Sequence, residues 1–127
     1  MKVRCRDVVN PSKGTRFMAL TRNTEYVVLS MEFYGDSLFA KSKGDFIIYR
    51  IIDDDNLLKP YPASIFEICS NRLSSCWVCY RNKDDAMQVL PQEWAYNGFW
   101  EQYYNDEPNA LLKFDLAKKQ IYSEIDN

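Results

Sequence analysis

The sequence contains no histidine, and its four glycines never cluster. Histidine is the usual general base near neutral pH and the commonest metal ligand, so its absence excludes Ser-His catalysis, Cys-His catalysis and His-based zinc sites. Phosphate-binding loops need glycines close together, and positions 14, 35, 44 and 98 do not meet that need. We therefore expect no enzymatic activity and no cofactor.

Long hydrophobic runs are also missing. Runs such as Tyr26–Leu29 and Phe46–Tyr49 are far shorter than the roughly 20 residues of a membrane-spanning helix. The charged start, Met1–Asp7, lacks the apolar stretch and the cleavage site of an export signal. We expect a cytoplasmic protein that contacts no membrane and keeps its four cysteines reduced.

The length of 127 residues, with 46% hydrophobic and 27% charged residues, is typical of one globular domain. Residues 1–50 carry nine Lys or Arg against five Asp or Glu, and residues 51–127 carry seven against thirteen, so the net charges are +4 and −6. The cations of the first half are scattered rather than gathered in a stripe, which argues against a nucleic acid partner. The acidic second half favours a cationic partner, because opposite potentials steer encounter.

Segments rich in β-branched and aromatic residues alternate with turn-forming residues before about residue 90. The strand ending at Asp53 runs into an acidic turn, and we expect the next strand to pair back on it as a hairpin. Pro60 and Pro62 cannot donate to a ladder, so they are expected only before that next strand. The predicted strands are residues 25–33, 45–53, 64–69, 76–80 and 86–90.

Helical spacing takes over after about residue 90. Pro91–Tyr96 and Phe99–Tyr104 predict short helical turns on either side of Asn97-Gly98. A longer helix is expected to begin at Asp106–Pro108, where acidic residues and proline suit a helix start. Its apolar face consists of Ala110, Phe114, Ala117, Ile121 and Ile125.

These patterns predict an α+β fold with a small, strongly bent antiparallel β-sheet or an SH3-like barrel, followed by C-terminal helices. Residues 1–127 are expected to form a single domain. Its β-rich part covers about residues 1–90, and the helical part, about residues 91–127, packs on it.

Cys76-Trp77-Val78-Cys79 has the spacing of a redox or zinc motif, and Cys5 and Cys69 could complete a four-cysteine set. A redox pair needs a helix N-terminus and a zinc knuckle needs a tight turn. Trp77 and Val78 instead favour an extended strand, which sends the two thiols to opposite faces. We interpret the cysteines as buried free thiols and expect no metal site.

The acidic turn Asp53-Asp54-Asp55 lacks the glycine and the distal glutamate of a calcium loop. Two interpretations remain open. It is either a hairpin turn that needs no ligand, or part of an acidic contact surface.

The densest feature is Trp94–Glu107, which holds six aromatic residues and three acids and no Lys or Arg. Two short helical turns cannot bury all of these rings, so some are expected at the surface beside Glu101, Asp106 and Glu107. Tyr and Trp supply rigid, amphipathic contact area, which is typical of interfaces. The segment either plugs one end of the barrel or anchors a partner.

Three segments carry a family resemblance: Tyr49–Asp55, Tyr61–Glu67, and Gly98–Glu101 with the following Tyr103-Tyr104. Together, over about residues 20–115, they resemble small bacterial immunity proteins of contact-dependent inhibition and other polymorphic toxin systems. Some of those proteins are similar to SH3-type barrels with helices added at the C-terminus.

The resemblance implies a cytoplasmic protein that binds the C-terminal domain of its cognate toxin and blocks the active site or the substrate surface. Many such toxins are nucleases, whose clefts must be cationic to hold phosphate. Acids would imitate the phosphate charge and aromatic rings would fill apolar hollows. The expected partner-binding residues are Asp53, Asp54, Asp55, Trp94, Tyr96, Glu101, Tyr103, Tyr104, Asp106 and Glu107.

Two other functions fit the same sequence. The first is an SH3-like adaptor or regulatory module that binds a peptide, or a ribosomal or transcriptional partner, through the same aromatics. The second is a small metal-dependent hydrolase that uses Asp53–Asp55 with Glu67. Without histidine, it would bind magnesium or manganese through carboxylates alone.

Overall fold

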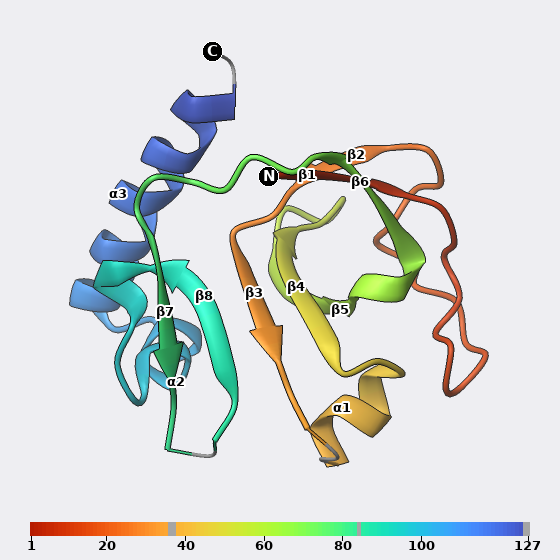
Figure 1. The fold of residues 1–127 in the computed structure, drawn as a ribbon, viewed down its shortest axis with the longest axis horizontal. Coiled ribbons are helices and arrows are strands. Elements are labelled where there is room, and N and C mark those ends of the chain that lie inside the picture. The colour runs from red at the N-terminus through yellow and green to blue at the C-terminus, as the bar shows by residue number, and fades with distance from the viewer. Residues whose placement is uncertain (36–37, 84, 126–127) are drawn as a thin grey trace.

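The computed structural model describes residues 1–35, 38–83 and 85–125. Within them the strands form two antiparallel sheets, one of order β2-β1-β6 and one of order β5-β4-β3-β8-β7 (Figure 1). The strands are β1 Lys2–Cys5, β2 Glu25–Val27, β3 Ser30–Phe33, β4 Ile47–Ile52, β5 Leu58–Pro62, β6 Phe66–Ser70, β7 Trp77–Arg81 and β8 Met87–Pro91.

The helical elements lie mainly after the last strand. They are α1 Leu38–Lys43, the 3-10 turns η1 Ala63–Ile65 and η2 Gln92–Trp94, α2 Phe99–Tyr104 and α3 Pro108–Ile125. The α+β class and the C-terminal helices are thus confirmed, whereas the described strands do not close into a barrel. None of the described helices is long and apolar enough to span a membrane.

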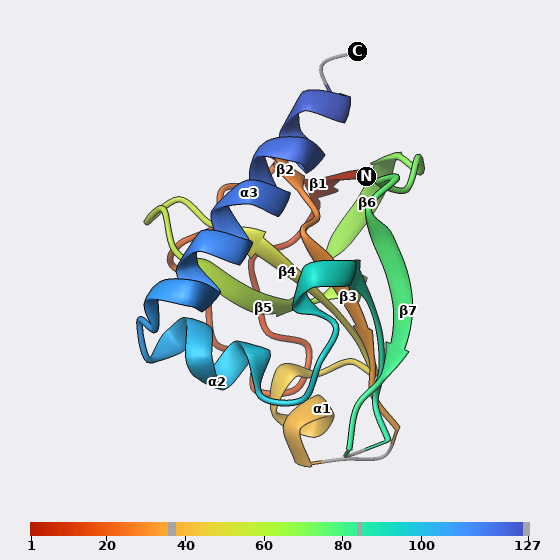
Figure 2. The same cartoon turned by 90° about the vertical axis from the view of Figure 1, so that its left-hand side faces the viewer.

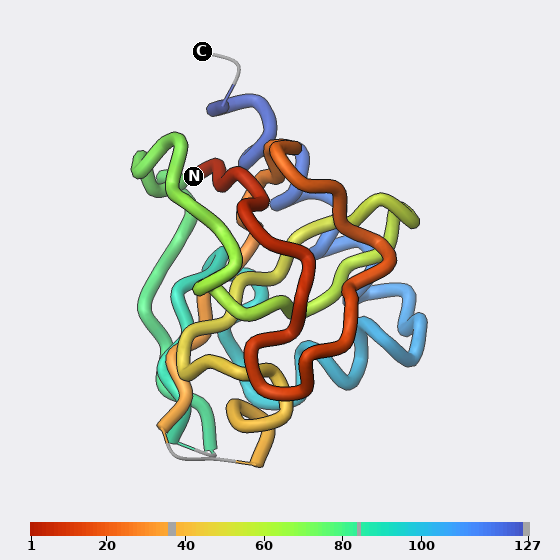
Figure 3. The backbone as a smooth tube through the Cα atoms, turned by 90° about the vertical axis from the view of Figure 1, so that its right-hand side faces the viewer, coloured from red at the N-terminus to blue at the C-terminus, as the bar shows by residue number. Residues whose placement is uncertain are grey.

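The five-stranded sheet is the middle layer of three. Alternate residues of β4 and β5 serve different cores: Ile51 and Tyr61 pack toward the three-stranded sheet, whereas Ile52 and Leu58 pack beneath the helices. Figure 2 shows α2 and α3 in front of the large sheet, and Figure 3 shows the N-terminal strand and loops on the opposite side. The candidate contact residues therefore lie on the helical side of the molecule and at the turns next to it.

Residues 25–33 form two strands instead of the single one predicted. The consecutive residues Val28 and Leu29 are both buried, but they enter different cores. The Val28 N–H donates to the Met1 carbonyl (3.0 Å) and the Leu29 N–H donates to the Arg50 carbonyl (2.9 Å). At this corner the chain leaves the small sheet and joins the large one, which gives two separate sheets in place of one bent sheet or barrel.

The predicted hairpin partner of β4 was wrong. β4 pairs with β5, so Pro60 and Pro62 lie inside a strand and not before one. β5 is an edge strand and has a partner strand, β4, on one side only. Proline has no N–H to donate, and an edge strand tolerates this where the N–H would point away from its partner. Residues 64–69 supply part of η1 and most of β6, which pairs with β1.

The sequence pattern did not reveal β1 or α1. β1 has only four residues, of which Val3 and Cys5 are fully buried. Its cation Arg4 lies 3.3 Å from the carboxylates of both Glu25 and Glu67, on the strands to either side. The charge of Arg4, in the charged start Met1–Asp7, is thus part of cross-strand ion pairs in the small sheet.

The C-terminal helices agree closely with the prediction. α2 has the expected bounds and α3 begins at Pro108. On α3 the predicted apolar face is the buried one, with Ala110, Phe114, Ala117 and Ile121 inside and Ile125 at the margin of the core.

An ion pair is buried between the large sheet and α2. Glu32 is fully buried, and both of its carboxylate oxygens accept from Nε of Arg50, at 3.1 and 3.0 Å. The Arg50 guanidinium also donates to the Tyr104 hydroxyl (3.1 Å) and lies 4.5 Å from the Trp100 ring centroid. Burial alone would lower the pKa of Arg50, but Glu32 raises it above its ordinary value. The pair connects β3 and β4 to the aromatic helix.

Candidate functional site

Asp53 is a structural residue of the β4–β5 turn. Its carboxylate accepts from the backbone N–H groups of Asp55 (3.0 Å) and Leu57 (3.2 Å) and from the Tyr61 hydroxyl (2.8 Å). Lys59 lies 3.2 Å from the same carboxylate, and the side chain of Asp53 is 0% exposed. The hairpin-turn interpretation therefore holds for Asp53, and its burial removes it from the predicted contact residues.

Asp54 and Asp55 are both exposed, but they differ in how much they are already bound. Asp54 accepts from the hydroxyls of Thr21 and Tyr26, each at 2.7 Å, and so holds the chain before β2 against the turn. Among the described residues, the carboxylate of Asp55 has a long contact with Lys59, 3.9 Å, and no other ion pair, and its side chain is 64% exposed. Of the three aspartates, Asp55 is the one most available to a partner.

The bond between Tyr26 and Asp54 predicts a loss of stability in alkali. Burial, with the Asp54 carboxylate as a further cause, raises the pKa of Tyr26 to about 12 from the ordinary value of 10.0. Between these values the folded chain keeps a proton that the unfolded chain has lost, so stability is complete below pH 10 and falls as pH rises toward 12, by about 1.4 kcal/mol per pH unit for one proton. Urea unfolding at several pH values measures the slope. Burial also raises the pKa of Tyr34, Tyr49 and Tyr61, so part of the slope remains in Tyr26→Phe. That variant should lose the share of one proton, and an unchanged slope would contradict the assignment.

Trp94 is completely buried and cannot reach a partner. Its ring stacks on Phe99 and Phe114, with centroid distances of 5.5 and 5.0 Å, and its Nε1 donates to the Lys113 carbonyl at 3.1 Å. The prediction that Trp94 is a contact residue is therefore wrong. The ring is a core residue, but it plugs no barrel, because the described strands form two separate sheets and Trp94 lies in the core beneath the helices.

Tyr103 and Tyr104 lie at the C-terminal end of α2, at the edge of that core. Tyr103 is half-buried and packs 4.5 Å from the Phe114 ring. Tyr104 is 48% exposed, and its hydroxyl donates to the Leu58 carbonyl at 3.0 Å. Both rings are anchored by the fold and still present a side to solvent, which suits rigid contact residues.

Asp106 sits in the turn between α2 and α3 with a left-handed backbone, φ 58°. Its N–H donates to the Tyr103 carbonyl (3.1 Å), and the N–H of Glu107 donates to the Gln102 carbonyl (3.0 Å). This pattern closes the helix end at a position where glycine is usual. Asp106 and Glu107 are both exposed, so the turn projects two carboxylates.

A groove joins the two acidic turns, and we call it the acidic groove. It has a volume of about 290 Å³. The exposed apolar side chains in it are Leu57 and Leu111, at 53% and 38% exposure. Asp106 lines it directly, while Asp55 contacts it through Lys59. Its lining residues are Leu57, Leu58, Lys59, Tyr103, Tyr104, Asp106 and Leu111.

The groove contains three predicted residues, Tyr103, Tyr104 and Asp106, and it adds four that were not predicted, Leu57, Leu58, Lys59 and Leu111. Leu57 follows the acidic turn, and Leu111 lies off the buried face of α3. The sequence did contain a signal for both residues: each is an apolar side chain at a position that does not belong to the buried face of its segment. Lys59 carried no signal, because its role depends on the pairing of β4 with β5.

Tyr96 and Glu101 lie elsewhere, in what we call the Gln88 pocket. This pocket of about 150 Å³ lies between the β7–β8 hairpin and the start of α2. The Tyr96 hydroxyl donates to the Gln102 side-chain oxygen (2.8 Å), and its ring lies 4.8 Å from the Lys113 ammonium. The lining residues are Tyr34, Asn82, Lys83, Gln88, Tyr96, Asn97, Gly98, Phe99, Trp100 and Glu101.

The four cysteines are free, but they are not all buried as predicted. Cys5 is buried, Cys76 is half-buried, and Cys69 and Cys79 are exposed. In the described parts of the chain, no three His, Cys, Asp or Glu side chains are close enough to hold a metal ion. Glu67, the fourth ligand of the hydrolase alternative, pairs with Arg4 instead.

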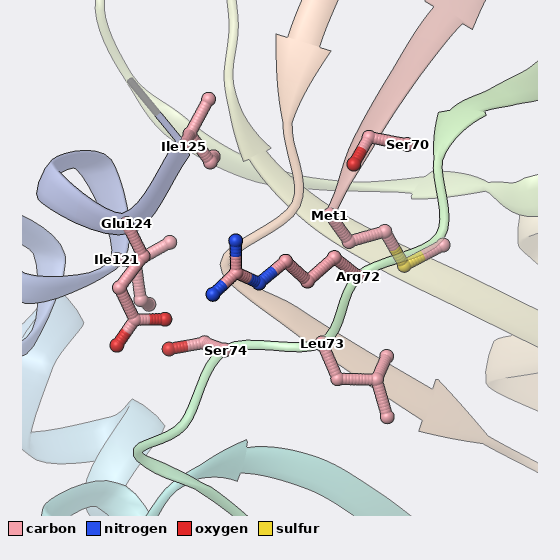
Figure 4. A pocket seen from close by; sticks show the side chains of 8 residues that line it. All are labelled: Met1, Ser70, Arg72, Leu73, Ser74, Ile121, Glu124 and Ile125. Atoms are coloured by element: carbon pink, nitrogen blue, oxygen red, sulfur yellow. The ribbon is translucent and has the colours of Figure 1, made fainter. Parts of the chain in front are cut away.

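A third hollow, of about 120 Å³, lies between α3 and the chain that connects β6 to β7 (Figure 4). Arg72, Ser74 and Glu124 are its main polar residues. The Glu124 carboxylate accepts from both the N–H and the hydroxyl of Ser75, which lowers the pKa of Glu124. This side chain therefore fastens α3 to the connection, and we assign the hollow no binding role.

Comparison with protein-family models, with curated proteins and with solved structures finds no match for this chain. The assignment of function therefore depends on the residues and geometry described above.

Proposed function

We propose that the protein is an immunity protein, which binds and neutralises a cognate bacterial toxin domain, most simply a nuclease, by occluding its active site or its substrate surface. The observation that supports the proposal best is the acidic groove, where exposed apolar side chains lie between two acidic turns. The resemblance of about residues 20–115 to small bacterial immunity proteins motivates the proposal, although no family model matches the chain. The SH3-type barrel of some of those proteins is not needed for the proposal.

The charge around the groove suits a cationic surface. Asp54, Asp55, Asp106 and Glu107 are exposed at its two turns. The one cation that lines it, Lys59, is already paired with the buried Asp53. The turns thus keep a net negative charge, which would steer a cationic nuclease cleft toward the groove and fix its register.

The apolar part of the groove supplies contact area. Leu57, Tyr104 and Leu111 are each more than a third exposed. A partner that covers them removes apolar surface from water, which contributes about 25 cal/mol per Å². An apolar centre within an acidic rim has the arrangement of a protein interface.

The backbone at Asp106 supports a role for its carboxylate. A residue with φ 58° at a helix end is usually glycine, because glycine has no Cβ penalty there. The aspartate has no ion pair or side-chain hydrogen bond among the described residues, so the fold gains nothing evident from its charge. Aspartate tolerates this backbone, as Asp85 does, and at this turn it leaves an exposed carboxylate for a partner.

Charge reversal at the groove should weaken the complex with the toxin domain encoded beside this gene. We expect Asp55→Lys with Asp106→Lys to raise Kd at least about a hundredfold, since buried interfacial charges of the wrong sign cost several kcal/mol. Calorimetry measures Kd, and growth rescue of toxin-expressing cells measures neutralisation.

The matched control is Asp85→Lys with Glu93→Lys. Asp85 also has a left-handed backbone, φ 64°, and both acids are exposed outside the groove, so the change in charge is equal. The control also breaks the exposed Arg81–Asp85 ion pair (2.9 Å), which is worth less than about 1 kcal/mol. The control should bind and rescue as the unchanged protein does. Equal loss in both variants would place the effect in overall charge and not in the groove. If no toxin domain binds, while peptides bind at micromolar Kd, the adaptor function would replace this proposal.

A further inference from the structure

The Gln88 pocket contains a buried amide without a partner. Gln88 lies on β8 opposite Glu32 of β3 and is 5% exposed. Both oxygens of Glu32 are taken by Arg50, and no hydrogen bond among the described residues involves the Gln88 side chain. Gln88 lines the pocket, so its polar atoms can be satisfied only from there. The side-chain nitrogen and oxygen of Gln88 are not among the buried unpaired atoms of the described residues, so they open onto the pocket, where a ligand can pair with them.

Trp100 lines the same pocket with its ring. Its Nε1 is buried without a hydrogen-bond partner among the described residues and is closed off from the pocket. Two neighbours fix the position of the Trp100 ring. The Arg50 guanidinium lies over it, and the Phe99 ring packs against it edge to face with a centroid distance of 5.0 Å. The pocket therefore combines a rigid aromatic wall with polar groups that the fold leaves unused.

The charges at the pocket favour an uncharged ligand. Lys83 and Glu101, which line it, have opposite signs, so the lining has no excess of either charge. Glu32, which pairs across the strands with Gln88, is neutralised by Arg50 at 3.0 Å. A phosphate or an ammonium group would find no cluster of opposite charge here.

The polar groups surround the pocket on several sides. Tyr34 follows β3, Gln88 belongs to β8, Asn97 precedes α2 and Glu101 lies on α2. The Asn97 oxygen already accepts from the Tyr80 hydroxyl (2.8 Å) and the Lys83 N–H (3.1 Å), which leaves its N–H₂ group to donate. A nucleobase carries polar atoms only along its edge, whereas a sugar ring carries hydroxyls, each a donor and an acceptor, all around it.

We propose that the Gln88 pocket binds an uncharged, hydroxyl-rich ring of monosaccharide size. At about 150 Å³ it is smaller than the roughly 300–1,000 Å³ of sites for larger ligands, so a single ring is what it can hold. Gln88, Asn97 and Glu101 hydrogen-bond the hydroxyls, and the Trp100 ring packs against an apolar face of the sugar. This site is separate from the acidic groove and does not rest on the proposed function.

The test is an NMR titration of the full chain with D-glucose, D-galactose, D-mannose, D-ribose and N-acetyl-D-glucosamine, each to about 50 mM, because ligands of this size bind with Kd of about 1 mM. At least one sugar should give saturable shifts at backbone amides around the pocket. Gln88→Leu should raise Kd at least about tenfold, while its Tm stays equal or rises because the unpaired amide is gone. Gln92→Leu, an exposed glutamine outside the pocket, is the matched control and should bind as the unchanged protein does.

Glu101→Ala is a second variant at an exposed position, where folding is not at risk, and it should also weaken sugar binding. Absence of saturable shifts with all five sugars would overturn the proposal. Binding of adenosine or uracil at the pocket in place of the sugars would overturn the ligand class. Sugar binding that persists unchanged in Gln88→Leu and in Glu101→Ala would overturn the location.

Discussion

Glu32→Ala is expected to destabilise the protein by about 3–5 kcal/mol, a large part of the roughly 5–15 kcal/mol that stabilises a typical domain. The substitution removes the only carboxylate that contacts Arg50 within the described residues. Arginine cannot lose its proton, so a guanidinium that is 7% exposed would remain charged and unpaired. Urea unfolding followed by circular dichroism measures the loss.

Two further variants separate this cause from simple loss of volume. In Glu32→Leu with Arg50→Met, both charges are removed and most of the stability should return, because apolar pairs replace buried ion pairs at little cost. Glu25→Ala is the matched control: Glu25 also contacts two cations, Lys2 and Arg4, but its side chain is 39% exposed. That control should cost less than about 1 kcal/mol. If Glu32→Ala cost no more than Glu25→Ala, the ion pair would not be a structural element of the fold.

Trp94→Ala should cost a similar amount, about 3–5 kcal/mol, for a different reason. It leaves a cavity between Phe99 and Phe114 and removes the hydrogen bond that the Trp94 Nε1 donates to the Lys113 carbonyl. Because this core fixes α2 and α3 to the sheet, the acidic groove should lose its shape together with the stability. Urea unfolding measures the first effect, and binding of the toxin domain measures the second.

Trp94→Phe keeps a ring to stack but loses the hydrogen bond and part of the buried indole, so it should cost less than the alanine variant, about 1–3 kcal/mol. Leu112→Ala is a control on α3, where the side chain is 59% exposed, and should change stability by less than about 0.5 kcal/mol. A Trp94→Ala variant with unchanged unfolding and reduced toxin binding would show that Trp94 reaches the partner after all, contrary to its burial.

The local parts of the fold were predictable from the sequence. The spacing of Ala110, Phe114, Ala117 and Ile121 indicated the buried face of α3, and the bounds of α2 followed from its flanking Asn-Gly and acidic turns. The β-branched run that became β4 was equally clear. These signals depend on neighbours within a few residues, which the sequence displays directly.

The pairing of strands was not predictable in the same way. β4 pairs with β5, although Pro60 and Pro62 argued against a strand there, because the rule on proline depends on which strand becomes an edge. The corner at Val28-Leu29 depends on two cores that only the complete fold creates. Tertiary contacts decided each of these points, and no local pattern encodes them.

The candidate site was predictable in composition but not in arrangement. The acids and aromatics of the predicted surface are present, but Trp94 and Asp53 are buried. Tyr96 and Glu101 line one hollow, whereas Tyr103 and Tyr104 line another. Six aromatic residues in one segment do not reveal which face of a short helix meets the core. The groove exists because the turn after β4 lies beside the turn before α3.

The most direct test of the proposed function is the affinity of this protein for the toxin C-terminal domain encoded beside its gene, measured by calorimetry at about 50 and about 300 mM salt. We predict a Kd of about 1 nM or tighter at low salt that weakens at least about tenfold at the higher salt, because acidic residues of the groove meet a cationic surface. Absence of binding at micromolar concentrations, or tight binding that does not depend on salt, would contradict the assignment of the acidic groove as the toxin-binding surface.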